Sequence, residues 1–388
     1  MPDKTFFSGN AILGILGGGQ LGKMLLQCTR TWDIHTRVLD PDPEAPARLA
    51  CNEFIQGKLS DYDTVYQFGK KCDVLSIEIE HVNTEALLQL KKEGLVIHPD
   101  PQALITIQDK GLQKQFFEQH ALPSPAFRLF LNKAEILQAI EDKNLNFPFV
   151  QKSRKDGYDG RGVQVIRNEA DIPKLMDVPC LTEDLVDIQT EIAVIAARNT
   201  QGDVICYDPV SMEFVEEANM LDLLLYPAPL APSLCKQAQE LASALIEKLN
   251  ICGLLAVEFL VDKNNTLWIN EVAPRPHNSG HQTIESTVTS QYEQHLRGIL
   301  GFPLGSVDVI RASAMVNLLG APGHQGDVLY EGMEECLAAD GVHVHIYGKR
   351  QTRPFRKMGH ATVTAEQLEQ AKNKALWVKQ TLKVISRS

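Results

Sequence analysis

The chain has 388 residues, of which 44% are hydrophobic and 22% charged, a composition typical of a globular protein with two or three domains. The formal net charge of −11 argues against broad nucleic-acid binding, which needs a positive face. No apolar run is long enough to cross a bilayer, and the opening MPDKTFFSGN is too polar for a secretory signal. We therefore expect a cytoplasmic protein with no membrane partner, and its eight cysteines, without a C-x-x-C pair, predict neither zinc sites nor disulfides.

Strands and helices alternate over the first part of the chain. Residues 11–16 have the pattern of a buried parallel strand, and a helix is expected over about 20–31. Further strands are expected at HTRVLD, which ends at Asp40, at DVLSIEIEHV and at LVIHPD. This alternation predicts a doubly wound α/β domain over residues 1–108.

The glycine turn after the first strand has three interpretations. Gly17, Gly19 and Gly22 match the dinucleotide fingerprint G-x-G-x-x-G. The same run matches a phosphate loop up to Met24, which stands where that loop needs Ser or Thr. The third interpretation is a tight turn in a domain whose ligand is neither a dinucleotide nor a nucleotide triphosphate.

The middle of the chain contains a candidate phosphate flap. TIQDKGLQKQFFEQHALPSP predicts a helix that ends at a Pro-rich turn, and FPFVQKSRKDGYDGRGVQVI predicts a hairpin with a glycine-rich tip. Lys152 ends the first strand of this hairpin, and Gly157, Gly160 and Gly162 free the backbone at the tip. Successive N–H groups and a lysine can hold phosphates. An ordinary flexible hairpin is the alternative.

Glu258 and Glu271 are candidate metal ligands. LAVEFLVD and TLWINEV are strand-like runs around Asn264-Asn265, a good turn pair. If those two residues form the tip, the two glutamates face each other on neighbouring strands. Like charges in that position destabilise a sheet, and a divalent cation such as Mg²⁺ would remove the penalty. The alternative is a solvated pair on an exposed face.

Two more polar runs follow. RPHNSGH, directly after Glu271, contains groups that can hold a small anion or neutralise developing negative charge. Later, YGKRQTRPFRKMGH gathers a basic cluster that suggests a bound phosphate in this acidic protein: Lys349, Arg350, Arg353, Arg356 and Lys357. A solvated basic turn is the alternative for the second run.

Together these segments resemble the ATP-grasp superfamily and, within it, the family of 5-(carboxyamino)imidazole ribonucleotide synthases. The resemblance rests on GGGQLGKM, EIEHV, QDK, GYDGRGV, EIAVI, INEVAPRPHNSGH and RKMGH, in that order, and covers nearly the whole chain. It implies an α/β ATP-grasp fold: a Rossmann-like domain over 1–108, a small lid domain over 109–190, and a mixed-sheet domain over 191–388 with a small terminal sheet from about 311. It also implies a homodimer.

The resemblance implies ATP-driven carboxylation of 5-aminoimidazole ribonucleotide by bicarbonate through carboxyphosphate, in purine biosynthesis. ATP and Mg²⁺ are the implied cofactors, with Mg²⁺ at Glu258 and Glu271. The implied ATP contacts are Lys110, Lys152, the loop 157–163 (Gly157, Tyr158, Asp159, Gly160, Arg161, Gly162, Val163), the hinge Glu183, Asp184, Leu185 and Val186, then Glu191, Asn270 and Glu271.

The other implied residues act on the two remaining substrates. Arg275, His277 and Asn278 are expected at the bicarbonate, and Tyr158, Asp159 and Arg161 on the amine side of the ribonucleotide. The ribonucleotide is expected at Gln20, Leu21, Lys349, Arg356 and Lys357. Glu78 and Glu80 are expected on one strand face, with at least one reaching the ribose or amine.

One departure and three alternatives accompany this interpretation. Position 214 is Phe where many family members carry a His near the ATP, so the contacts of 211–226 do not carry over. The related formate-dependent glycinamide ribonucleotide transformylase is an alternative enzyme. Asp40, 18 residues beyond Gly22, also permits a nicotinamide-dependent oxidoreductase. A non-catalytic nucleotide-sensing module is the third alternative.

Overall fold

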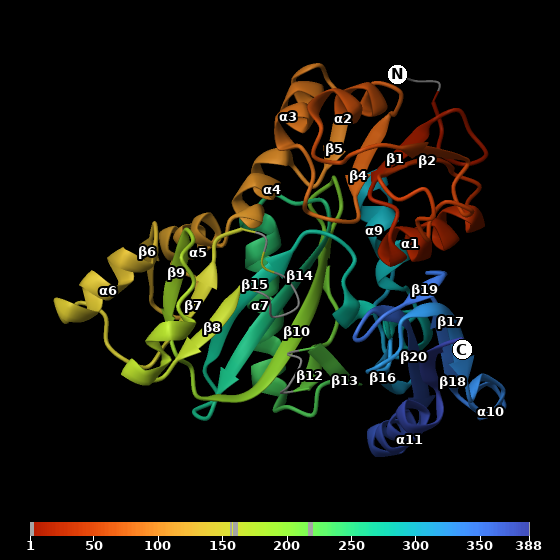
Figure 1. Ribbon diagram of the computed structural model, residues 1–388. Helices are drawn as coiled ribbons and strands as arrows, with labels where there is room; N and C mark the ends of the chain where they lie inside the picture. The colour runs from red at the N-terminus through yellow and green to blue at the C-terminus, as the bar shows by residue number, and fades with distance from the viewer. Residues whose placement is uncertain (1–3, 156, 158–161, 216–219, 388) are drawn as a thin grey trace.

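The computed structural model describes residues 4–155, 157, 162–215 and 220–387. Figure 1 shows an N-terminal α/β unit above a large central sheet, a lid to the left and the C-terminal segment at the lower right. Within the described ranges, no helix is long and apolar enough to span a lipid bilayer. The α/β class and the mixture of parallel and antiparallel sheets agree with the sequence-based expectation.

The N-terminal unit is a parallel sheet in the order β3-β2-β1-β4-β5. Helices α2 and α3 cover one face, and α1 covers the other together with α9, which comes from much later in the chain. The predicted doubly wound arrangement is therefore confirmed. The elements are β1 (Ile12–Leu16), α1 (Gln20–Thr31), β2 (His35–Asp40), β3 (Glu53–Gln56), α2 (Tyr62–Gly69), β4 (Val74–Ile77), α3 (Thr84–Lys92) and β5 (Val96–His98).

Two helices, α4 (Pro101–Gln108) and α5 (Lys110–Gln119), connect this unit to the lid. The sequence predicted one continuous helix here, and that prediction was wrong. Asp109 has extended backbone angles, φ −120° and ψ 109°, and its side chain accepts hydrogen bonds from the N–H groups of Gly111 and Leu112. It therefore ends α4 and caps α5 at the same point.

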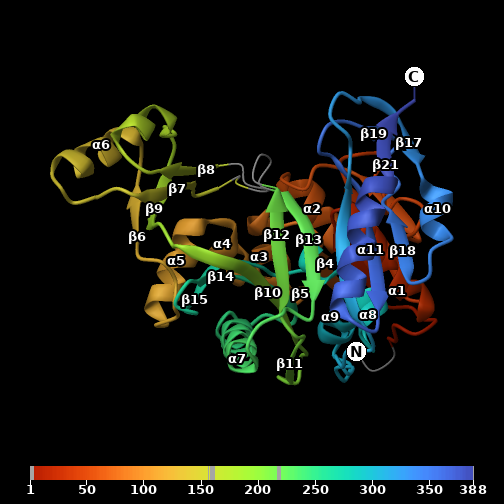
Figure 2. The ribbon, with the colours of Figure 1, turned by 90° about the horizontal axis from the view of Figure 1, so that it is seen from below.

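The lid is an antiparallel sheet in the order β6-β9-β7-β8, and Figure 2 shows it projecting to one side of the molecule. The predicted hairpin is β7–β8, in which Lys152 pairs with Val163. The lid elements are β6 (Phe127–Phe130), α6 (Lys133–Glu141), β7 (Phe149–Ser153), β8 (Val163–Ile166), the 3₁₀ helix η1 (Glu169–Lys174) and β9 (Cys180–Asp184).

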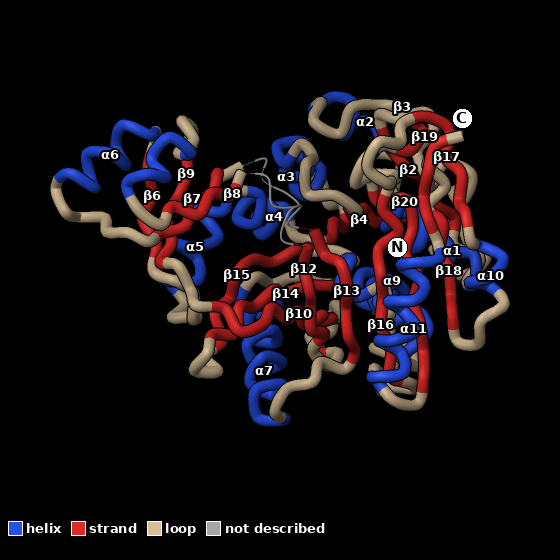
Figure 3. Tube along the Cα trace, turned by 60° about the horizontal axis from the view of Figure 1, so that its bottom comes forward, coloured by secondary structure: helices blue, strands red, loops and turns tan. Residues whose placement is uncertain are grey.

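The large sheet runs β15-β14-β10-β12-β13-β16-β20-β18, with β11 paired to β10. Figure 3 shows α7 lying across one face of its first strands, where apolar side chains of α7 pack on β10 and β14. The elements up to residue 300 are β10 (Ile188–Arg198), β11 (Val204–Cys206), β12 (Val210–Val215), β13 (Met220–Tyr226), α7 (Pro232–Lys248), β14 (Gly253–Asp262), β15 (Leu267–Ala273), η2 (Asn278–Gly280), α8 (Thr283–Ser286) and α9 (Gln291–Leu300).

The C-terminal strands divide between two sheets. A small sheet in the order β19-β17-β21 stands where one was expected, but β16, β18 and β20 extend the large sheet instead of joining it. Helix α11 packs on β16 and β20. These elements are β16 (Ala312–Leu319), β17 (Gly326–Glu331), α10 (Met333–Leu337), β18 (Val342–Ile346), β19 (Gln351–Thr352), β20 (Lys357–Ala365), α11 (Leu368–Thr381) and β21 (Lys383–Ser386).

Candidate active site

A large cleft of about 1970 Å³ lies between the N-terminal unit, the lid and the large sheet. This volume exceeds that of an ordinary single-ligand pocket. Of the described residues that the family resemblance assigns to a ligand, all but Gly162 line it; Tyr158, Asp159, Gly160 and Arg161 lie outside the described residues. Those that line it are Gln20, Leu21, Glu78, Glu80, Lys110, Lys152, Gly157, Val163, Glu183, Asp184, Leu185, Val186, Glu191, Glu258, Asn270, Glu271, Arg275, His277, Asn278, Lys349, Arg356 and Lys357.

Glu258 and Glu271 are cross-strand partners in the β14–β15 hairpin, so the predicted pairing is confirmed. The predicted turn was one residue too short. Asp262 donates its N–H to the carbonyl of Thr266 at 3.1 Å, and the turn therefore contains the three residues 263–265. A three-residue turn alone would offset the pairing by one position.

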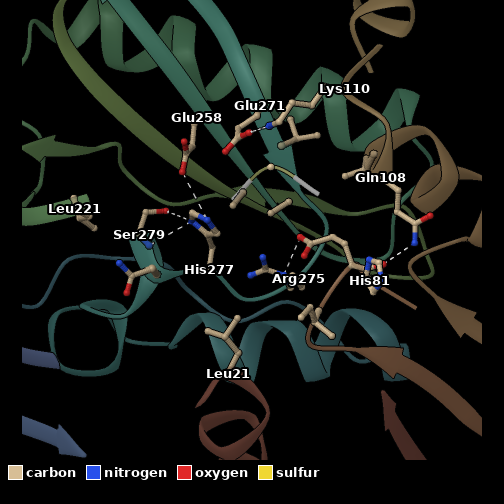
Figure 4. Close-up of a pocket in the computed structure, with 18 of the residues that line it drawn as sticks. Leu21, His81, Gln108, Lys110, Leu221, Glu258, Glu271, Arg275, His277 and Ser279 are labelled. Atoms are coloured by element: carbon tan, nitrogen blue, oxygen red, sulfur yellow. Dashed lines mark hydrogen bonds and ion pairs between the residues drawn. The ribbon is translucent and has the colours of Figure 1, made fainter. Parts of the chain in front are cut away.

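A β-bulge at Asn270 restores the pairing. Phe259 pairs with Ile269, whereas the next residue of β14 toward the N-terminus, Glu258, pairs with Glu271 and leaves Asn270 as the extra residue. A bulge breaks the strict alternation of side chains, and Asn270 and Glu271 both line the cleft although they are consecutive. Figure 4 shows Glu258 and Glu271 reaching into the same cavity from neighbouring strands.

The two carboxylates lie in different electrostatic surroundings. Burial and the charge of Glu271 raise the pKa of Glu258. The ammonium of Lys110, which forms an ion pair with Glu271, holds the pKa of Glu271 below its usual value. Among the described residues, no three His, Cys, Asp or Glu side chains form a metal cluster. Two adjacent carboxylates nevertheless fit Mg²⁺, which completes its shell with water and phosphate oxygens.

Lys110 owes its position to the start of α5. Its N–H bonds to the carbonyl of Arg154 at 2.9 Å, and the Arg154 guanidinium binds both carboxylate oxygens of Asp109 at 2.8 Å. This bidentate pair fixes the helix start to the lid. The side chain of Lys110 therefore projects from the first turn of α5 toward Glu271, as Figure 4 shows.

The loop after β15 carries the guanidinium of Arg275 and the imidazole of His277 beside the two glutamates of the hairpin. Arg275 Nε lies 2.8 Å from an oxygen of Glu80, and His277 Nε2 lies 3.7 Å from an oxygen of Glu258. Gln291 holds this loop, because its side chain accepts from the His277 N–H at 2.9 Å and donates to the His277 carbonyl at 2.8 Å. The arrangement presents positive charge and N–H donors next to the two carboxylates (Figure 4).

The glycine turn is filled by the chain's own carboxylates. Glu78 accepts hydrogen bonds from the N–H groups of Gly19 and Gly22, both at 2.9 Å, and Asp40 accepts from Gly18 at 2.7 Å. In a dinucleotide site these donors and an acid like Asp40 bind the pyrophosphate and ribose. Because they already have partners, the turn does not present an anion-binding site, and of its three interpretations the tight turn fits best.

Glu78 and Glu80 do not share a strand face, and that prediction was wrong. Strand β4 ends at Ile77, so the alternation of side chains stops before either glutamate. Glu78 turns back under the glycine turn, where burial raises its pKa to about 7, and Glu80 turns toward Arg275. A Cβ at Gly19 would lie 2.7 Å from a Glu78 oxygen, which explains the absence of a side chain there.

Lys349, Arg356 and Lys357 of the basic cluster line the cleft. Lys349 donates to the carbonyl of Lys357 at 2.8 Å, and Arg356 donates to the carbonyl of Gln351 at 2.6 Å. Burial, and then the nearby Arg356, lowers the pKa of Lys349 to about 8. Arg350 also lines the cleft, whereas Arg353 is not among the described lining residues.

The sequence did not single out Lys114, which is 2% exposed and pairs with the equally buried Glu183 at 2.8 Å. The same glutamate binds Lys152 at 2.7 Å. A signal was available, since Lys110, Lys114 and Phe117 recur at helical spacing on one face of α5. A lysine within an apolar face predicts a buried charge partner.

Comparison with known proteins places the chain among ATP-grasp proteins. Residues 115–292 match the ATP-grasp domain, residues 11–108 the ribonucleotide synthetase preATP-grasp domain, and residues 313–374 the phosphoribosylaminoimidazole carboxylase C-terminal domain. A solved N5-carboxyaminoimidazole ribonucleotide synthetase from Thermotoga maritima is 39% identical, with a TM-score of 0.89 over 97% of this chain and all of that chain.

The chain belongs to the N5-carboxyaminoimidazole ribonucleotide synthase family. The enzyme of that name from Staphylococcus aureus is 34% identical over 93% of this chain and 94% of its own length. An Aspergillus clavatus synthase solved with ADP and 5-aminoimidazole ribonucleotide is 31% identical, with a TM-score of 0.87 over 96% of this chain and 98% of that chain.

Some relatives are longer than this chain. Phosphoribosylaminoimidazole carboxylase of Schizosaccharomyces pombe is 36% identical over 92% of this chain, but the chain spans only 65% of that protein. The matches to the carboxylating family favour it over the formate-dependent, nicotinamide-dependent and sensor alternatives.

Proposed function

We propose that the chain catalyses the ATP-dependent carboxylation of 5-aminoimidazole ribonucleotide by bicarbonate. The products are N5-carboxyaminoimidazole ribonucleotide, ADP and phosphate, in a step of purine biosynthesis. The observation that carries the proposal is the pairing of Glu258 with Glu271 in a cleft that Lys110, Lys152 and Arg275 also line. Membership of the synthase family supports it.

ATP would lie between the lid and the large sheet. We assign its phosphates to Lys110, Lys152 and the loop 157–163, and its adenine and ribose to the hinge 183–186 and Glu191. Among the described residues of this set, all but Gly162 line the cleft. Burial raises the pKa of Glu191, and its side-chain oxygens can accept a hydrogen bond from a ribose hydroxyl.

Mg²⁺ would be held by Glu258 and Glu271, with Asn270 beside them, and would supply charge neutralisation at the transferring phosphoryl group. When ATP enters, its phosphates can take over the Lys110 ammonium that neutralises Glu271 in the free protein. The protein's part in this step is to position the two reactants and to stabilise charge.

The reaction requires a small anion beside the γ-phosphate. We assign bicarbonate to Arg275, His277 and Asn278, of which Arg275 is held by Glu80 and His277 by Gln291. A bicarbonate oxygen attacks the γ-phosphorus, and ADP leaves with the electron pair of the broken P–O bond. The carboxyphosphate formed then transfers its carboxyl group to the exocyclic amine, directly or as carbon dioxide, while phosphate leaves and the amine loses a proton.

The ribonucleotide would occupy the other end of the cleft. We assign its phosphate to Lys349, Arg356 and Lys357, and its ring and ribose to Gln20, Leu21 and Glu78. The proposed roles of Tyr158, Asp159 and Arg161 on the amine side concern residues outside the described ones. A homodimer remains a prediction, which sedimentation would test.

The direct test is ADP release measured in bicarbonate and in bicarbonate-depleted buffer, with and without 5-aminoimidazole ribonucleotide. We expect turnover only when both are present. Turnover with formate and glycinamide ribonucleotide instead would assign the chain to the transformylase reaction. ATP binding without turnover under any of these conditions would favour a nucleotide sensor.

A further inference from the structure

A buried row of alternating charges lies behind the proposed ATP site. Lys114 Nζ is 2.8 Å from one oxygen of Glu183, and Lys152 Nζ is 2.7 Å from the other. Lys152 also donates to the side-chain oxygen of Asn270 at 2.8 Å. The row therefore joins α5, β9, β7 and β15, the elements that form the back of the lid and the edge of the large sheet.

The two lysines differ in what they can reach. Lys152 is 12% exposed and lines the cleft, whereas Lys114 is only 3% exposed through its side chain and is not among the described lining residues. Among the described residues, the Lys114 ammonium also contacts the carbonyl of Ile269 at 3.4 Å and the ring of Phe117 at 5.8 Å. Lys114 thus cannot touch a nucleotide, and its partner of opposite charge is Glu183.

The balance of charge around Glu183 explains why Lys114 contacts it in addition to Lys152. Burial opposes ionisation of Glu183, but the charges of Lys152 and Lys114 outweigh burial and hold its pKa below the usual value. A carboxylate paired with Lys152 alone would neutralise that lysine and compete with any phosphate for it, because Coulombic attraction is strong in a poorly solvated site. With two lysines on one carboxylate, the group keeps a net positive charge.

We propose that Lys114 is a positioning residue that acts through Glu183 and keeps the charge of Lys152 available to a nucleotide phosphate. The proposal rests on the proposed ATP site. It differs from a merely structural role, in which Lys114 would compensate a buried carboxylate and leave ligand affinity unchanged in any variant that folds.

Calorimetric titration of the full chain with ADP and with adenosine tests the proposal. For K114M we expect the Kd of ADP to rise about tenfold or more, the size of one charge-assisted hydrogen bond, and the Kd of adenosine to stay within about threefold. K236M is the matched control, because Lys236 is an exposed lysine of α7. Equal losses for ADP and adenosine, or no loss for ADP, overturn the proposal.

A double variant provides the sharper test. Glu183 also belongs to the proposed hinge, so the single variant E183Q is the reference. In K114M/E183Q the carboxylate that competes for Lys152 is gone, and we expect the Kd of ADP to stay within about threefold of that of E183Q, a coupling that independent sites do not show. A loss relative to E183Q as large as the loss that K114M causes in the parent overturns the proposal. If the parent itself does not bind ADP, the proposed ATP site fails instead, which separates the two failures.

A second measurement covers the case in which K114M does not fold. Burial lowers the pKa of Lys114 to about 8, with Glu183, Lys152 and Lys110 as the charged groups around it. At about pH 9.5 the parent loses this charge, whereas K114R keeps it because arginine does not titrate there. We expect ADP affinity to fall about tenfold more in the parent than in K114R between about pH 7 and pH 9.5. Equal falls overturn the proposal.

Discussion

Two regions of the cleft carry groups that can attract anions, and the chain treats them in opposite ways. At the glycine turn, the N–H groups of Gly18, Gly19 and Gly22 are bound by Asp40 and Glu78. At the β14–β15 hairpin, Glu258 and Glu271 face each other, and lysines from α5 and β7 surround them. In the first region the N–H donors already have partners within the chain. In the second region the charged side chains can form new ion pairs when a ligand binds.

A glycine motif predicts a ligand only where its N–H donors remain available. Backbone N–H groups need partners when they are buried, and at the turn the chain itself provides carboxylates. Two carboxylates on neighbouring strands have the opposite requirement, because they repel each other until a cation arrives. The hairpin, rather than the turn, is therefore the region where we place nucleotide and metal.

The largest expected effect tests the open region. Glu271→Gln keeps the shape of the side chain but removes one of two metal-binding charges, so we expect ADP release to fall by at least about 10³-fold. Glu240→Gln, at an exposed position of α7, should retain activity. Undiminished turnover in Glu271→Gln would remove the hairpin from the mechanism.

The next effect concerns the wall that carries the basic cluster. Lys349→Ala should raise the KM for the ribonucleotide about 30-fold, the value of one charge-assisted hydrogen bond, and leave the Kd of ATP unchanged. Lys383→Ala, an exposed change in the same part of the chain, is the control. A loss confined to ATP binding would show that the two ends of the cleft are assigned the wrong way round.

The hydrogen bonds of the glycine turn can be removed by a substitution of Glu78. Glu78→Ala leaves the N–H groups of Gly19 and Gly22 without their partner, so we expect the free energy of unfolding to fall by about 2 kcal/mol. Denaturant titration measures this loss. Quenching of tryptophan fluorescence by NADH in the parent would contradict the closed turn, since a dinucleotide needs the donors that Glu78 occupies.

A smaller effect tests the ion pair that links the two regions. Glu80→Gln frees Arg275 from its partner, and we expect the KM for bicarbonate to rise about tenfold. Glu118→Gln on the exposed face of α5 is the control. An increase in the KM for the ribonucleotide alone would mean that Glu80 contacts that substrate directly, as the sequence suggested.

The smallest effect is a pH dependence. Burial lowers the pKa of Lys349 to about 8, so this lysine is charged below that pH and neutral above it. We expect kcat/KM for the ribonucleotide to fall to about half its plateau near pH 8 and to decline further above it, because kcat/KM reports groups of the free enzyme. A profile that stays flat to about pH 10 would exclude Lys349 from phosphate binding.

Local pattern determined much of this protein from sequence alone. Helix α1 over Gln20–Thr31 and strand β2 ending at Asp40 follow from apolar periodicity, which depends only on neighbouring residues. The pairing of Glu258 with Glu271 was also predicted correctly, although two differences from the expected hairpin offset each other. The turn has one residue more than expected, and the bulge at Asn270 shifts the register back by one residue. Nearly all the described candidate site residues meet in one cleft.

Only the tertiary structure could show the roles of side chains whose partners lie far away in the sequence. Whether the N–H groups of the glycine turn are free depends on Glu78, and the direction of Glu80 depends on Arg275. Lys114 gains its partner of opposite charge only because α5 packs beside β9 and brings Glu183 to it. Sequence pattern specifies which face of an element is buried, but a charge buried on that face takes its role from whichever opposite charge the fold brings within reach.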